Sequence, residues 1–151
     1  MGLRLFLFFS LIGFLVMVTV RLIVQEPDKA TKTKIKQRDQ LAKEAQALVN
    51  SGELDKATEL FERVYQHEQA IYGDSHAELL GTLKMLSQVA KAKQDHDAVV
   101  GYFERQQNIT QKLYGADDYR TKDAARAVTD AKRIAALTPD QRGQLEKADA
   151  L

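Results

Sequence analysis

The chain has 151 residues and no cysteine, and its 22 Lys and Arg against 21 Asp and Glu give a formal net charge of +1 at pH 7. This length has room for one modest domain, and the absence of cysteine excludes disulfide bonds and thiolate chemistry. Residues 25–151 carry 20 Lys and Arg against 21 Asp and Glu, a balance that gives no electrostatic footprint for binding nucleic acid.

The first 24 residues differ in composition from the rest. From Leu5 to Val20 the sequence has sixteen uncharged, mostly apolar residues, and Arg4 and Arg21 flank them. A helix needs about 20 residues, each rising about 1.5 Å, to cross a bilayer, and arginines near its ends can reach the headgroups. We therefore predict that residues 1–24 form a transmembrane signal-anchor helix.

A cleaved signal peptide is the alternative to this anchor. Its apolar core should be followed by a small-x-small cleavage site, but residues 17–21 read Met-Val-Thr-Val-Arg, without an Ala or Gly pair. A lipoprotein anchor needs a cysteine that the chain lacks, and Phe6 stands where N-myristoylation requires Ser or Thr. The uncleaved anchor is therefore favoured.

Residues 25–37 are predicted to be a basic juxtamembrane linker. Pro27 should stop the membrane helix, because the residue before a proline is pushed out of the helical region. Residues 28–36 are polar and basic, and are either a linker or the start of the next helix. This basic stretch suits anionic lipid headgroups. The positive-inside rule favours a cytoplasmic C-terminal domain, although a short N-terminal tail with one arginine is also typical of exported chains. The cations within about 20 residues after the span are Arg21, Lys29, Lys32, Lys34, Lys36 and Arg38.

Residues 38–151 are predicted to be helical throughout. Good helix formers dominate, and apolar residues recur at the helical spacing i, i+3, i+4, i+7. Short turns between helices of this length give antiparallel hairpins, so the fold class is all-α. The expected helices span residues 38–49, 54–71, 76–93, 97–113 and 118–137, and a short sixth helix begins after the N-cap Thr138.

The sequence repeats itself at a spacing of 42 residues. The tripeptide Phe61-Glu62-Arg63 returns as Phe103-Glu104-Arg105, and Tyr72-Gly73 returns as Tyr114-Gly115. Self-similarity at one fixed period indicates stacked units, none of which can bury its apolar face alone. The expected function is therefore recognition on an extended surface.

These residues resemble tetratricopeptide repeats of the longer, roughly 42-residue kind found in kinesin light chains. The resemblance covers residues 38–137 and is strongest in the stretch GELDKATELFERVYQHEQAIYGDSHAELLGTL. It implies a short right-handed α-solenoid of about five to six helices, ending in a capping helix within the 38–151 domain. The second repeat departs from the pattern at two positions, where Gln94 and Val99 replace a glycine and a small residue. The repeat positions occupied in turn are Ala45, Gly52, Ala57 and Phe61, then Ser87, Gln94, Val99 and Phe103.

The sequence carries no recognisable catalytic or cofactor motif. It has no nucleophile elbow, phosphate loop or glycine-rich fingerprint. Its three histidines, His67, His76 and His96, include no pair on one helical face, so a metal site is not expected. We predict a protein that is not an enzyme and binds no cofactor.

The resemblance also implies that the first helix of each pair lines a concave groove. Basic side chains there can hold a carboxylate or an acidic peptide, whereas a merely solvated helix face is the alternative. The predicted function is a non-catalytic, membrane-anchored adaptor or assembly scaffold for an unidentified protein or peptide partner, without nucleic acid. An exported repeat domain with a cleaved signal, or a regulatory subunit docking on an enzyme, remains open. The predicted groove residues are Lys43, Gln46, Lys84, Gln88, Arg126 and Asp130.

Overall fold

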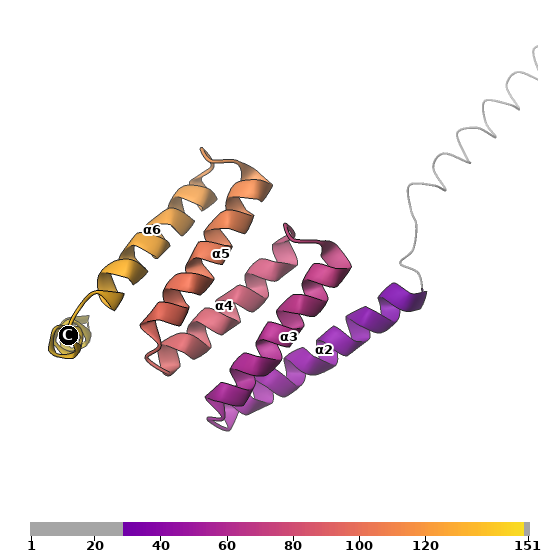
Figure 1. Ribbon diagram of the computed structural model, residues 1–151, viewed down its shortest axis with the longest axis horizontal. Coiled ribbons are helices and arrows are strands. Elements are labelled where there is room, and N and C mark those ends of the chain that lie inside the picture. Colours follow the sequence, from indigo (N-terminus) through magenta and orange to yellow (C-terminus); the bar gives the residue numbers. More distant parts are fainter. Residues whose placement is uncertain (1–28, 150–151) are drawn as a thin grey trace, which may run out of the picture. The chain divides into compact units, whose positions relative to one another are not determined.

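The computed structural model describes residues 29–149, so the predicted anchor over residues 1–24 lies outside the described part. The described residues form helices joined by short turns and contain no strand (Figure 1). From α3 to α6, each helix packs against the next one in the chain. This confirms the predicted all-α fold with stacked neighbouring helices. The helices are α2 (Lys29–Asn50), α3 (Leu54–Tyr72), α4 (Ala77–Ala92), α5 (His96–Tyr114), α6 (Tyr119–Ala135) and α7 (Pro139–Asp149).

The 42-residue spacing reappears in the helix boundaries. Helices α3 and α5 each have 19 residues, and α5 begins and ends 42 positions after α3. Helix α6 likewise begins 42 positions after α4. The sequence echo therefore reflects a structural repeat.

Two glycines explain why α3 and α5 end at equivalent positions. Gly73 has φ 84° and Gly115 has φ 88°, values in the left-handed region that glycine tolerates best. The Gly73 N–H donates to the Gln69 carbonyl at 2.8 Å, and the Gly115 N–H donates to the Gln111 carbonyl at 2.9 Å. The repeated Tyr-Gly pair is thus a repeated helix terminus.

Helix α2 is longer than the sequence indicated. It begins at Lys29 and runs for 22 residues, so residues 29–36 are the start of a helix. Lysine, glutamine and alanine in this stretch all favour helix. At the other end of the chain, the predicted capping box is confirmed. The Thr138 N–H donates to Gln141 Oε1 at 2.9 Å, and the Gln141 N–H donates to Thr138 Oγ1 at 3.3 Å.

The hydrophobic core is centred on α4, which contributes the fully buried Leu79, Leu83 and Leu86. Ala45 of α2 and Ala57 of α3 are completely buried. Small side chains there let neighbouring helices approach closely. No helix among residues 29–149 combines the length and the apolar character that crossing a bilayer requires.

Candidate binding groove

A concavity lies between the end of α4, the first half of α5 and the second half of α6. A hollow of about 570 Å³ opens there, and a second of about 380 Å³ lies between the α4–α5 turn and α7. Gln94 and His96 line both hollows, so we treat them together as the C-terminal groove. Its apolar floor consists of Val99, Phe103, Ala127, Ala131 and Ile134, and its rim includes Lys91, Gln94, His96, Asp130 and Arg142.

Two positions on the floor of the groove carry smaller side chains in the second repeat than in the first. Met85 occupies the position 42 residues before Ala127, and Val89 the position 42 residues before Ala131. Val89 belongs to the buried core and Met85 packs against it. Since alanine lacks the side-chain volume that methionine and valine supply, these two exchanges widen the floor of the groove.

The rim differs between the repeats in the same way. Val49 and Leu54 pack against the core of the first repeat. Their counterparts 42 residues later are Lys91 and His96, which line the groove. Two apolar side chains that close the first repeat are thus replaced by polar side chains that border an opening.

The corner of the groove holds a strained residue. Gln94 has φ 58°, the only positive φ of a non-glycine among the described residues. Its counterpart in the first repeat is Gly52, with φ 81°. The turn is fixed by Asp95, whose carboxylate Oδ1 accepts the Ala98 N–H at 3.0 Å at the start of α5. The Gln94 N–H donates to the Lys91 carbonyl and the Asp95 N–H donates to the Ala90 carbonyl, both at 2.9 Å, so the left-handed Gln94 ends α4 in a Schellman motif.

Charged residues of both signs border the groove. The Lys91 ammonium lies 5.0 Å from the Phe103 ring centroid, a distance that allows a cation–π contact. On α6, Asp130 faces the opening and pairs with Arg133 at 3.6 Å. Arg142 of α7 donates to the Leu137 carbonyl at 2.6 Å, which attaches α7 to the end of α6. The groove therefore offers both a cation and an anion beside an apolar floor.

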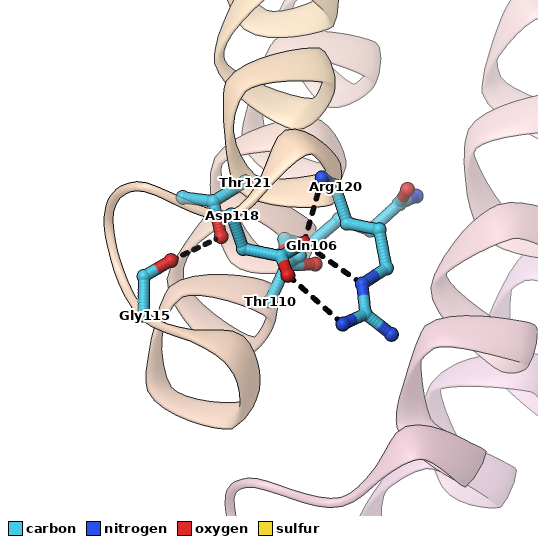
Figure 2. Close-up of polar contacts among 6 residues, drawn as sticks. All are labelled: Gln106, Thr110, Gly115, Asp118, Arg120 and Thr121. Carbon is cyan, nitrogen blue, oxygen red and sulfur yellow. Dashed lines mark hydrogen bonds and ion pairs between the residues drawn. The ribbon is translucent and has the colours of Figure 1, made fainter.

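The α5–α6 junction is held by a compact set of polar contacts (Figure 2). The Asp118 side chain accepts the Arg120 backbone N–H at 2.9 Å and two guanidinium hydrogen bonds at 2.8 and 3.0 Å. The side-chain hydrogen bond from Arg120, with the backbone one, lowers the pKa of Asp118 to about 2. The Thr121 hydroxyl donates to the Gly115 carbonyl at 2.7 Å, and the Arg120 guanidinium lies 3.4 Å from the Tyr114 ring centroid. These contacts fix the start of α6, whose later turns form one wall of the groove.

A second polar cluster joins α2, α3 and α4. The Glu68 side chain is 4% exposed, and its Oε1 accepts a hydrogen bond from Arg38 Nη1 at 3.1 Å. Arg38 also lies 2.9 Å from Asp39 and 3.7 Å from Glu78. Burial raises the pKa of Glu68, and hydrogen bonds from Thr82 and Arg38 partly oppose that rise. An acid held this closely by an arginine fits a structural clamp between helices.

The histidines occupy separate places. His76 caps α4, where its Nδ1 accepts the Glu78 N–H at 3.3 Å and its ring stacks on Tyr72 at 4.7 Å. His96 lines the groove at the start of α5. In residues 29–149 no group of three or more His, Asp or Glu side chains is placed to hold a metal ion.

Of the six predicted groove residues, only Asp130 lines the C-terminal groove. Five of the six are exposed, and Gln46 is half-buried and bonds to Asn50 at 3.3 Å. Arg126 pairs with Asp123 on its own helix at 2.6 Å. Within the described part of the chain, no hydrogen bond or ion pair joins any two of the six. The groove is also lined by Lys91, Gln94 and His96, which were not predicted as groove residues. A comparison of residues 42 positions apart could have revealed them. The exposed five are Lys43, Lys84, Gln88, Arg126 and Asp130.

Comparisons with known proteins do not assign this chain to a family. A scan against protein-family models finds no match, and a search of curated proteins finds none either. The functional assignment therefore depends on the groove and on the sequence that precedes the helices.

Proposed function

We propose that this chain is a non-catalytic, membrane-anchored adaptor or assembly scaffold that holds a segment of a partner protein in the C-terminal groove. The helices form a short, right-handed array like that of tetratricopeptide repeats, with α7 as its cap. The observation that carries the proposal is the hollow floor of the second repeat, where Ala127 and Ala131 stand in place of Met85 and Val89.

The chemistry of the groove suits an aliphatic side chain carried by a protein segment. In the first repeat, Met85 and Val89 occupy the positions of these two alanines and pack in or against the core. An aliphatic anchor entering there regains the packing that the alanines leave out. Lys91 and Asp130 at the edge can orient polar groups of the same segment.

The predicted anchor holds the groove at a membrane surface. Residues 3–24 have the length of a membrane span, and four residues separate them from the basic start of α2. Holding the groove at a bilayer raises its effective concentration near membrane-bound partners. A modest affinity is therefore sufficient for capture.

Site-specific photo-crosslinking in native membranes tests this proposal. A photoreactive amino acid replaces Lys91 at the groove or, as the matched control, Lys112 on the exposed far part of α5. We expect a discrete adduct with one partner from position 91 and none from position 112. Equal adducts from both positions, or none from position 91, would reject the groove as the docking site.

A further inference from the structure

Helix α2 has a basic face turned away from the helical core. Lys36 and Lys43 are exposed and lie seven residues apart, which places them on one face about 10 Å apart along the axis. Lys29, seven residues before Lys36, continues the same spacing in the sequence. Ala45, about 200° around the helix from Lys43, is fully buried. The lysines therefore point away from the packed side of α2.

Charge is segregated along the chain. Residues 29–43 contain six Lys and Arg and one Asp, whereas residues 44–151 contain 14 Lys and Arg and 18 Asp and Glu. The one acid of this stretch, Asp39, is engaged by Arg38 at 2.9 Å. The basic face of α2 thus belongs to a cationic segment in a chain whose remainder is net acidic, an asymmetry that favours an anionic surface as partner.

We infer that the face of α2 bearing Lys36 and Lys43 lies along anionic phospholipid headgroups. This inference rests on the membrane anchor of the proposed function. The apolar stretch ends at Val24, five residues before Lys29, and five extended residues reach at most about 17 Å. A span ending there keeps the start of α2 beside the headgroups, where lysines interact favourably with anionic lipid. Lys43, predicted above to be a groove residue, is thereby assigned to lipid.

The distance of Lys43 from the lipid distinguishes an α2 helix that lies along the bilayer from one that stands perpendicular to it. It is 14 residues beyond Lys29, or about 21 Å along the helix axis. Electrostatic attraction between exposed charges is screened within about 10 Å at 0.1 M salt. Lys43 therefore senses the lipid surface only if α2 lies along it, and Ala47, exposed on the same face, lies close to that surface too.

The experiment uses the full chain in vesicles of phosphatidylcholine, with or without phosphatidylserine. Because the chain has no cysteine, the Ala47→Cys variant has a single site for a water-soluble maleimide. A separate variant, Glu59→Cys, places the single cysteine at an exposed position of α3 and is the reference. We expect phosphatidylserine to slow labelling at position 47 only, and high salt to abolish the slowing. Lys43→Gln should weaken the association of the α2 face with the lipid surface about fivefold. Replacing Lys84, an exposed lysine on α4, by Gln should leave this association unchanged.

Alkaline carbonate extraction of the same vesicles separates the two ways of failing. Carbonate-resistant chains that label equally fast at position 47 with and without phosphatidylserine would overturn the lipid-facing helix and leave the anchor in place. Release of the chain by carbonate would overturn the anchor and this inference together. Slowed labelling in resistant chains, reversed by Lys43→Gln, supports both.

Discussion

At the scale of single residues, Gln94 has a strained backbone conformation and lines the groove. Its φ of 58° is a left-handed conformation, which costs an ordinary side chain about 1–2 kcal/mol. Glycine avoids that cost but loses about 0.5–1 kcal/mol more conformational entropy on folding. We expect Gln94→Gly to stabilise the fold by about 0.5–1 kcal/mol, measured by urea unfolding.

Gly73 allows the converse change, in which a side chain is added at a residue with positive φ. It has φ 84°, and a Cβ added there would meet no atom within 4 Å, so any cost of a side chain is conformational. Because φ 84° and ψ 176° lie in a region that is essentially restricted to glycine, Gly73→Ala should destabilise the fold by about 1–3 kcal/mol. A loss of stability in Gln94→Gly would show that the glutamine side chain contributes more than its backbone strain costs.

The Arg38–Glu68 pair should behave as a clamp in a double-mutant cycle. Their side chains are 15% and 4% exposed, so removing the arginine leaves the buried Glu68 carboxylate without its charged partner. We expect Arg38→Met to cost about 3–5 kcal/mol, and the double variant with Glu68→Met to recover most of that loss. Additive losses in urea unfolding would mean that the two side chains act independently.

At the scale of elements, the sequence predicted the helices that have clear terminal signals. Helix α3 was expected over residues 54–71 and runs over Leu54–Tyr72, because Gly73 supplies the left-handed residue after it. The start of α2 was harder to locate, since the lysines of residues 29–36 show no apolar periodicity. Its first turns are set by helix propensity, which is a weak local signal.

The C-terminal groove could not be predicted from motifs, because it arises from side-chain volume that is missing. A change from Met85 to Ala127 between repeats looks conservative in sequence, since both residues are apolar and favour helix. Only their place against the core shows that the exchange opens a hollow. Asp130, one of the residues predicted from the repeat pattern, is among the residues that line this hollow, and its role in binding stays a prediction.

Restoring the first-repeat residues should stabilise the second repeat. We expect Ala127→Met with Ala131→Val to raise stability by about 0.5–2 kcal/mol, as cavity filling commonly does. The converse variant, Met85→Ala with Val89→Ala, should lose at least about 2–5 kcal/mol, because it opens a packed core. Thermal unfolding measures both. A destabilised filled variant would indicate overpacking, and hence a floor that is already closed.

At the scale of the whole molecule, the chain combines two kinds of surface. The basic face of α2 suits a lipid surface beside the predicted anchor, and the C-terminal groove suits a protein segment. Met85 and Val89 pack in or against the core in the first repeat, whereas the corresponding Ala127 and Ala131 line the groove in the second. Retaining a hollow at the cost of stability is typical of functional sites.

The most direct test of this account is the photo-crosslinking yield from position 91 in native membranes, compared between the wild-type chain and the Ala127→Met, Ala131→Val variant. Ala77→Met with Ala116→Val, at two exposed alanines, is the matched control. We predict that the filled variant is at least as stable as the wild type but forms no partner adduct, whereas the control crosslinks normally. A filled variant that folds and still gives the wild-type adduct would contradict the account.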